Sequence, residues 1–247
     1  LELLHNFTLV HDDIMDSDDT RRNMPTVHKK YDVPSAILAG DGIFTISQLI
    51  LGTIQNNSNH LLQKYNEMVL EICEGQALDK QFEGEDKLNL DNYIEMVKKK
   101  TGALLGACLS LPALISHENS EKVNELYDAG KSLGVGFQIH DDIFEIFGEE
   151  SIIGKSLGSD ISSNKNTAIA IVAKERNKVE WSNLTNEFDG KDLYKIRKFL
   201  EENNVKTKVE NIADSYFLSA FKSLKNLEID EKNELYGFFK MIQERSY

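Results

Sequence analysis

Helical periodicity runs through almost the whole chain, and no long stretch alternates apolar and polar residues as a half-buried strand does. In residues 1–16, for example, apolar side chains recur at spacings of three and four, which places them on one helix face. The 247 residues include only three prolines, Pro25, Pro34 and Pro112, and this leaves room for long helices. No Pro-, Gly- or Ser-rich linker divides the chain. The pattern predicts an all-α fold, a single domain over residues 1–247 formed by a bundle of about ten helices.

The apolar repeats and the capping residues give approximate bounds for these helices. Ser35 is a plausible N-cap for the second helix. Polar loops are expected between the helices predicted at 1–16 and 35–55, and between those predicted at 121–147 and 167–176. The predicted helices cover 1–16, 35–55, 61–82, 91–116, 121–147 and 167–176, with three more amphipathic helices from residue 191.

Two of the expected helices carry nearly the same acidic sequence near their ends. The first reads His11-Asp12-Asp13-Ile14-Met15-Asp16 and the second His140-Asp141-Asp142-Ile143-Phe144-Glu145. Residues four apart share a helix face, and like charges on one face repel each other. Two such clusters in one domain call for a counter-charge, and carboxylate oxygens suit Mg²⁺. The sequence therefore predicts a magnesium site whose candidate ligands are Asp12, Asp13, Asp16, Asp141, Asp142 and Glu145.

Composition limits the partners and the compartment of the protein. A formal net charge of −13 disfavours nucleic acid or an anionic membrane surface as a general partner. The longest apolar stretch recognised in the sequence, Leu104 to Ile115, is too short to span a membrane. Cys73 and Cys108 lie in helical patterns and suggest buried thiols in a reducing compartment, so we expect a cytoplasmic protein.

An acidic protein that binds an anionic substrate needs metal ions or local basic residues, and five basic residues stand out. Arg21 and Arg22 follow the first acidic cluster, and guanidinium groups match the geometry of phosphate. Lys100 precedes a run of small apolar residues. Lys155 and Lys165 lie in a Gly-containing loop after the second cluster. We interpret these side chains as candidate phosphate ligands.

These motifs resemble the trans-type isoprenyl diphosphate synthases, the polyprenyl synthetases, and most of all those of the archaeal geranylgeranyl type. Glu145 departs from the family pattern, which usually has Asp at this position, although a carboxylate remains. The family also has an upstream segment with a Gly-Gly-Lys sequence, an Arg and a His that bind isopentenyl diphosphate, and these 247 residues do not contain it. The shared motifs in chain order are Asp12-Asp13-Ile14-Met15-Asp16 with Arg21-Arg22, Gly75-Gln76 with Asp79, Lys100-Thr101, Phe137-Gln138, Asp141-Asp142, Lys155, Asp160 and Lys165.

The resemblance implies an isoprenoid synthase fold around a central cavity, and a homodimer. It implies head-to-tail condensation of isopentenyl diphosphate with an allylic diphosphate such as dimethylallyl, geranyl or farnesyl diphosphate. Three Mg²⁺ ions are implied, two held by Asp12 and Asp16 and a third by Asp141. The implied roles of the other side chains are stabilisation of the leaving pyrophosphate by Arg21, Lys100, Lys155 and Lys165, binding of isopentenyl diphosphate by Arg22, and stabilisation of the allylic cation by Thr101 and Gln138.

Product length is expected to depend on the turns before the first acidic cluster. Thr8 lies four residues before Asp12 on the same helix face, and Phe7 lies beside Thr8. In the resembled family, one aromatic and one small residue here imply a C20 product, geranylgeranyl diphosphate. A farnesyl diphosphate synthase, with a C15 product, is the alternative.

Three other functions share some of these features. A terpene cyclase would share the all-α fold and one aspartate cluster, but its second metal site usually has a different pattern. An HD-type phosphohydrolase is suggested by His11-Asp12 and His140-Asp141, yet no further set of histidine ligands stands out. A non-catalytic subunit that regulates a prenyl synthase fits the missing upstream segment, whereas the intact acidic motifs argue against it.

Overall fold

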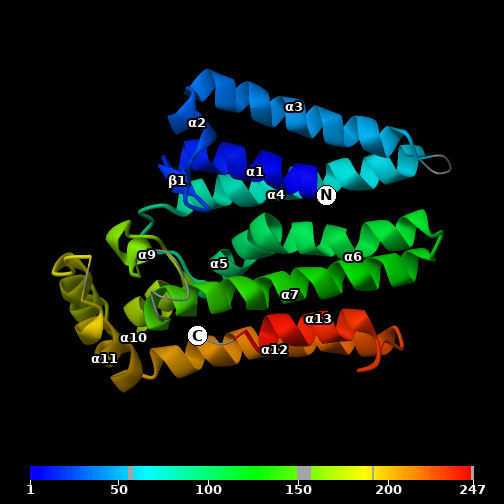
Figure 1. Cartoon of the computed structure of the whole chain (residues 1–247). Helices are drawn as coiled ribbons and strands as arrows, with labels where there is room; N and C mark the ends of the chain where they lie inside the picture. The colour runs from blue at the N-terminus through cyan, green and yellow to red at the C-terminus, as the bar shows by residue number, and fades with distance from the viewer. Residues whose placement is uncertain (55–57, 149–156, 191, 246–247) are drawn as a thin grey trace.

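The computed structural model describes residues 1–54, 58–148, 157–190 and 192–245, and most of these are helical (Figure 1). The all-α prediction is therefore confirmed. A two-stranded antiparallel hairpin, β1 (Thr20–Arg21) with β2 (Met24–Pro25), is a small exception in the described chain. The helices are α1 (Glu2–Met15), α2 (Val27–Lys30), α3 (Val33–Gly52), α4 (Ser58–Phe82), α5 (Leu90–Val97), the π-helical turn η1 (Lys98–Gly102), α6 (Ala103–Ile115), α7 (Ser120–Phe147), α9 (Ser159–Ser162), α10 (Ala168–Asn186), α11 (Tyr194–Glu202), α12 (Val205–Asn226) and α13 (Glu234–Gln243).

Local differences from the predicted helices have physical reasons. The N-cap of α3 is Asp32, whose carboxylate accepts a hydrogen bond from the Ser35 backbone N–H at 2.7 Å, so the cap predicted at Ser35 is wrong. The run predicted over 91–116 contains the π turn η1, where one extra residue enters the helix. Helix α10 continues past the predicted end at residue 176 through a kink at Asn177.

The helices form stacked layers (Figure 1). Helix α3 lies outermost and packs on α1, while α4 packs against η1 and α6. Helix α7 runs through the middle of the bundle and packs against α6 on one side and α12 on the other. The two acidic clusters fall at the C-terminal end of α1 and in the last turns of α7. Both ends lie on the same side of the bundle in Figure 1.

Glycines bring α6 and α7 into backbone contact. A Cβ atom added to Gly130 would lie 2.5 Å from the carbonyl oxygen of Leu105 and 2.6 Å from the Cα of Gly106. A Cβ atom at Gly134 would lie 2.6 Å from the Cα of Gly102. These close contacts fix the position of η1 (Lys98–Gly102) against α7, the helix that ends in the second acidic cluster.

We expect Gly130→Ala to lower the free energy of unfolding by about 1–3 kcal/mol, because the added methyl group meets backbone atoms that side-chain rotation cannot move away. Gly237→Ala in α13 is the matched control, since a Cβ atom there meets nothing within 4 Å. That control should be neutral or stabilising by up to about 1 kcal/mol. Urea unfolding followed by circular dichroism measures both values, and equal stability of the two variants would contradict the packing described here.

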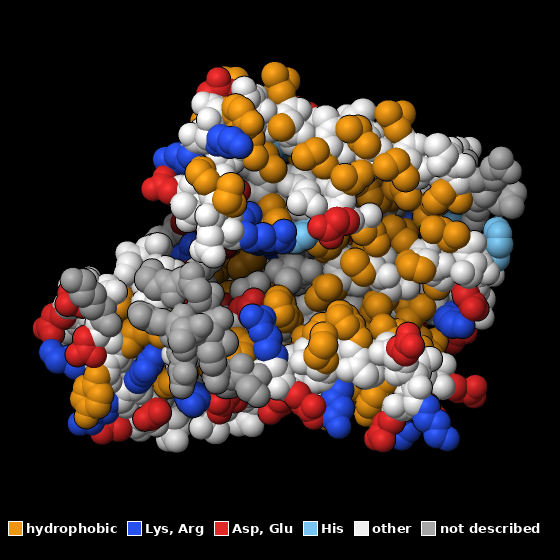
Figure 2. All heavy atoms as spheres, in the orientation of Figure 1, with side chains coloured by type: hydrophobic (Ala, Val, Ile, Leu, Met, Phe, Trp, Pro, Cys, Tyr) orange, Lys and Arg blue, Asp and Glu red, His pale blue; other side chains and the backbone are white. Residues whose placement is uncertain are grey.

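Helix α3 presents an apolar face away from the bundle. Its exposed large side chains include Ile37, Leu38, Ile46, Leu49 and Ile50, and hydrophobic atoms cover much of the upper helices in Figure 2. By length and composition alone, α3 could cross a membrane, which was not predicted from the sequence. Core helices of water-soluble proteins meet the same criterion, but only 17% of the apolar window of α3 is buried within the chain.

Candidate active site

A cavity of about 860 Å³ lies between α1, α4, the η1–α6 region and α7. Asp12 from the first acidic cluster and Asp141 from the second both line it, so the two clusters face one cavity, as predicted. Lys and Arg side chains gather around a hollow between the upper helices and the lower part of the bundle in Figure 2. The apolar part of the lining comes from residues such as Leu1, Phe7, Leu9, Ile72, Ala77, Leu104, Leu105 and Phe137.

Lysines surround the outward carboxylates of the first cluster. The Lys100 ammonium lies 3.5 Å from Asp12 Oδ1 and 2.6 Å from Asp79 Oδ2. The Lys80 ammonium lies 3.0 Å from Asp16 Oδ1, and that of Lys165 lies 3.8 Å from Asp16 Oδ2. Burial raises the pKa of Asp12 more than Lys100 lowers it. Burial also acts on Asp16, but the hydrogen bond from Lys80 and the charges of Lys165 and Lys100 bring its pKa below the usual value.

Asp13, in contrast, faces the protein interior. Its side chain is 4% exposed, and Oδ1 accepts bonds from both Nε and Nη2 of Arg21 at 2.6 Å. This ion pair anchors the hairpin that follows α1, because Arg21 lies in β1. Arg21 also lines the cavity, whereas Arg22 is exposed and is not among the lining residues that the structure describes. The prediction that Asp13 is a metal ligand is therefore not supported by its position.

Asp142 is the buried counterpart in the second cluster. Its Oδ2 accepts hydrogen bonds from the Tyr93 hydroxyl at 2.5 Å and the Ala168 backbone N–H at 2.9 Å, and its Oδ1 accepts one from Gln138 at 3.3 Å. Burial raises the pKa of the Asp142 carboxyl. The side chain thus joins α7 to α5 and α10, and its role as a metal ligand stays a prediction.

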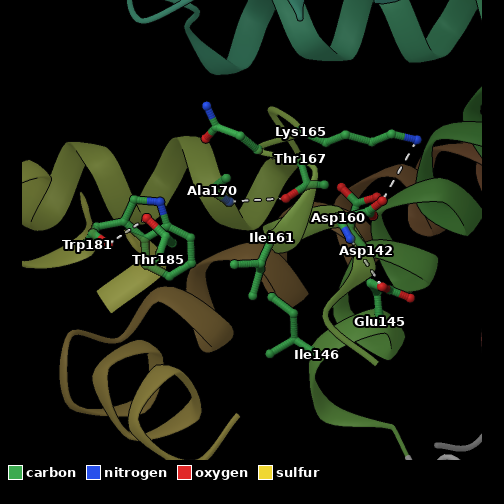
Figure 3. A pocket seen from close by; sticks show the side chains of 11 residues that line it. Asp142, Glu145, Ile146, Asp160, Ile161, Lys165, Thr167, Ala170, Trp181 and Thr185 are labelled. Atoms are coloured by element: carbon green, nitrogen blue, oxygen red, sulfur yellow. Dashed lines mark hydrogen bonds and ion pairs between the residues drawn. The ribbon is translucent and has the colours of Figure 1, made fainter. Parts of the chain in front are cut away.

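Glu145, which replaces the usual Asp of the second motif, caps a short helix. Its Oε1 accepts hydrogen bonds from the backbone N–H of Ser159 at 2.6 Å, from the Ser159 hydroxyl at 2.7 Å and from the N–H of Asp160 at 3.3 Å. Figure 3 shows Glu145 close to Asp142 and Asp160, with the Lys165 side chain extending past Asp160. The longer Glu side chain therefore holds α9, and a metal role is not supported by these contacts.

Asp141 is the outward carboxylate of the second cluster. Its Oδ1 lies 3.1 Å from Nη1 of Arg245, near the C-terminal end of the described chain. The guanidinium carbon of Arg245 also lies 5.1 Å from the ring centroid of Phe144 and 5.7 Å from that of Phe137. The C-terminal segment after α13 thus reaches back to the second acidic cluster.

The polar side chains of η1 and α7 meet in the cavity. Thr101 donates a hydrogen bond from its hydroxyl to the amide oxygen of Gln138 at 3.2 Å, and both line the cavity beside Lys100. A smaller pocket of about 170 Å³ adjoins the cavity through these three residues and is also lined by Lys165. Lys155, which was predicted to bind phosphate, lies outside the described residues.

The predicted chain-length residues and both cysteines line the same cavity. Phe7 packs against His11 and Phe44 with ring centroids 4.8 and 5.1 Å apart, and Thr8 lies next to it in the lining. Cys73 and Cys108 are exposed to the cavity, so the prediction of buried thiols is wrong. Helical periodicity placed the cysteines on inward faces, but those faces border a hollow and not a packed core.

Mg²⁺ is the metal ion that the oxygen donors of the two acidic clusters suit best. Among the described residues, no group of three His, Cys, Asp or Glu side chains stands close enough to hold a metal ion. Magnesium does not require such a cage, because it usually keeps several waters and binds one or two carboxylates together with substrate phosphates. Asp12, Asp16 and Asp141 offer only oxygen atoms, and their partners are flexible basic side chains that can move. The residues therefore fit Mg²⁺ that arrives with a diphosphate.

Sequence reasoning missed several residues of the site. Lys80 was not predicted, although it directly follows the motif from Gly75 to Asp79. The signal that could have identified it is a charged residue in a helix that faces the cavity. Tyr93 and Arg245 reach the second cluster from 49 and 104 residues away. No local sequence pattern predicts such distant contacts.

Comparison with known proteins places these motifs in a family. Residues 1–210 match the family model "Polyprenyl synthetase". The chain is 42% identical over 175 residues to a short chain isoprenyl diphosphate synthase from Methanocaldococcus jannaschii, covering 70% of this chain and 53% of that protein. It is 34% identical over 247 residues to a geranylgeranyl diphosphate synthase from Sulfolobus acidocaldarius, covering 96% of this chain and 74% of that protein.

The fold agrees with the sequence comparison. The crystal structure of a geranylgeranyl pyrophosphate synthetase from Pyrococcus horikoshii superimposes with a TM-score of 0.89 at 33% identity, covering 99% of this chain and 77% of that chain. The chain spans about half the length of the first curated relatives that it matches, for example 53% of the Methanocaldococcus protein. The predicted resemblance, including that to archaeal geranylgeranyl diphosphate synthases, is confirmed, and the chain belongs to the polyprenyl synthetase family.

Proposed function

We propose that the protein is a Mg²⁺-dependent trans-prenyltransferase that condenses isopentenyl diphosphate head-to-tail with an allylic diphosphate. The observation that carries the proposal is the shared cavity, which is lined by Asp12, Asp141 and Lys100 together with many apolar side chains. Its volume of about 860 Å³ falls within the range of small-molecule sites. Family membership and the names of the relatives support the same reaction class.

The first chemical step requires pyrophosphate to leave the allylic substrate. Magnesium bound at the carboxylates supplies positive charge to the leaving group. Lys100 and Lys165 converge on the first cluster and would share the negative charge that develops on the pyrophosphate. Arg21 lines the cavity and is held in place by its ion pair with Asp13, so it would lose little conformational freedom on binding a phosphate. Lys155 and Arg22 remain candidates for phosphate binding from sequence alone.

The second step is attack of the isopentenyl double bond on the allylic cation. The Gln138 amide oxygen and the Thr101 hydroxyl both line the cavity and can direct their dipoles at the cation. Loss of a proton completes the new double bond, and the departing pyrophosphate is the expected acceptor. The apolar lining keeps water from the cation, which would otherwise be quenched.

A cyclase or a phosphohydrolase would share the fold or the acidic residues but would give a cyclic hydrocarbon or inorganic phosphate. Incubation of the purified protein with Mg²⁺, isopentenyl diphosphate and farnesyl diphosphate separates these outcomes. Chromatography of the dephosphorylated products should show a C20 alcohol, in line with the geranylgeranyl names of several relatives. With geranyl diphosphate in place of farnesyl diphosphate and isopentenyl diphosphate still present, a product that stops at C15 would favour the farnesyl alternative. No condensation at all would favour a regulatory subunit.

We also propose a homodimer that buries the apolar face of α3. Leu38 and Leu49 are 70% and 67% exposed on this face, and Leu70 on the neighbouring α4 is 64% exposed. A contiguous apolar surface of this kind is rare on a monomer in water. The sequence from residue 43 to 54, which is rich in apolar residues, lies in the same region and is long enough to serve both core and interface.

Light scattering at micromolar concentration should give twice the mass of one chain. The double variant Leu38→Glu and Leu49→Glu should give a monomer, because it places charge in a dehydrated interface. Val179→Glu, at a position 73% exposed on α10, is the control and should leave the dimer intact. A monomeric native protein, or a double variant that still dimerises, would rule out this interface.

A further inference from the structure

Lys80 is a basic residue of the cavity to which neither the motifs nor the proposed mechanism assigns a role. It lies near the C-terminal end of α4 and lines the cavity together with Asp12, Arg21 and Lys100. Its ammonium group reaches across to the C-terminal end of α1. There it donates to Asp16 Oδ1 at 3.0 Å and to the carbonyl oxygen of Met15 at 3.1 Å.

A second lysine in α4, Lys64, shows by comparison which contacts of Lys80 support the helix and which belong to the site. Lys64 pairs with Glu67 three residues on, at 2.8 Å, and Lys80 pairs with Glu83 three residues on, at 2.5 Å. Both pairs are of the ordinary kind that supports a helix by a few tenths of a kcal/mol. Only Lys80 adds a contact with the first acidic cluster, where the Asp16 side chain is 13% exposed. The reach of Lys80 toward the cavity is therefore not needed for the helix.

The geometry at Asp16 indicates what Lys80 binds during the reaction. An ammonium group has three donors, and here they serve Asp16, Met15 and Glu83. A divalent ion about 2.1 Å from an Asp16 oxygen would repel the neighbouring ammonium and take up that acceptor. The lysine stem is flexible, and the phosphate oxygens that accompany the ion are the strongest acceptors within reach.

We propose that Lys80 is a further diphosphate-binding residue, which turns one donor from Asp16 to a phosphate oxygen when metal and diphosphate bind together. The proposal rests on the proposed function, because it places the diphosphate beside the first acidic cluster. It adds a cation from α4 to those from β1, η1 and the loop before α10. The site would then contact the diphosphate from a fourth element of the bundle.

Calorimetric titration with inorganic pyrophosphate in excess Mg²⁺ tests the proposal. Lys80→Met should weaken pyrophosphate binding by about 10-fold or more, the loss expected for one charge-assisted hydrogen bond. Lys80→Arg should recover most of the affinity, since the charge and a donor remain. Lys64→Met is the matched control and should bind as the native protein does. Binding of Mn²⁺ alone, followed by electron paramagnetic resonance, should be unchanged or tighter in Lys80→Met.

The other outcomes are decisive as well. Pyrophosphate binding by Lys80→Met that equals the native affinity would overturn the proposal. Equal loss in the Met and Arg variants, or loss of Mn²⁺ binding in both, would mean that Lys80 only supports the fold around Asp16. If Lys80→Met does not fold, Lys80→Gln gives the same comparison. A native protein that binds pyrophosphate with Mg²⁺ but does not condense the substrates would refute the proposed function and leave Lys80 as a diphosphate ligand.

Discussion

Asp12→Asn is expected to lower kcat by about 10²–10³-fold, the cost typical of removing one preorganised electrostatic group from an active site. Asp12 lines the cavity and is a candidate ligand for the ion that neutralises the leaving group. The amide is nearly the same size but carries no charge. Because burial raises the pKa of Asp12, the neutral side chain should not lower the melting temperature. Activity is measured by the incorporation of isopentenyl diphosphate at saturating Mg²⁺.

Asp86→Asn serves as the control for this variant. Asp86 is an exposed carboxylate 3.4 Å from Lys178 at the surface, and its loss should leave kcat within twofold. Asp13→Asn gives a second comparison, because Asp13 is buried against Arg21. We expect it to lower stability as well as activity. If Asp12→Asn kept native turnover while folded, the first acidic cluster would not take part in the chemistry.

Variants of Phe7 and Thr8 should shift the length of the product in opposite directions. Phe7→Ala enlarges the cavity below the first cluster and should give products beyond C20, whereas Thr8→Phe narrows it and should favour C15. Growth past a closed floor requires overpacking that costs about 1–3 kcal/mol, which corresponds to roughly 5- to 150-fold in rate. Chromatography of the dephosphorylated products measures the ratio of chain lengths.

Phe221→Ala is the matched control for the loss of an aromatic ring. Phe221 packs on Tyr236 and Phe239 between α12 and α13, and it is not part of the cavity lining. The product distribution of Phe221→Ala should equal that of the native protein. The same distribution for the native protein and for both Phe7→Ala and Thr8→Phe would show that α1 does not set the product length.

Sequence alone predicted the parts of the fold that depend on local periodicity. The long helices α1 and α7 match the predicted ranges within a few residues, and the repeated acidic sequence correctly placed both clusters at one cavity. Periodicity also shows that neighbouring aspartates point about 100° apart. It cannot tell which of Asp12 and Asp13 faces the cavity, because that choice depends on Arg21 in a following hairpin.

Tertiary contacts account for the features that sequence did not predict. The π turn η1 lies against α4, where a Cβ atom on Gly75 would come within 2.2 Å of the backbone nitrogen of Lys100. Such a contact between residues 25 positions apart leaves no local signature. The buried position of Asp142 likewise depends on Tyr93, whose hydroxyl comes from another helix. Asp13, Asp142 and Glu145 thus have structural partners that the sequence did not predict, and their role as metal ligands stays a prediction.

The central claim is that Asp12 and Asp16 of the first cluster and Asp141 of the second bind the metal ions that accompany a diphosphate. A crystal structure of the protein with Mg²⁺ and a non-hydrolysable allylic diphosphate analogue tests it most directly. We expect oxygens of Asp12, Asp16 and Asp141 to lie about 2.1 Å from the ions, with the diphosphate between the two clusters. Ions bound instead by Asp13, Asp142 or Glu145, or a diphosphate located outside the shared cavity, would contradict the account.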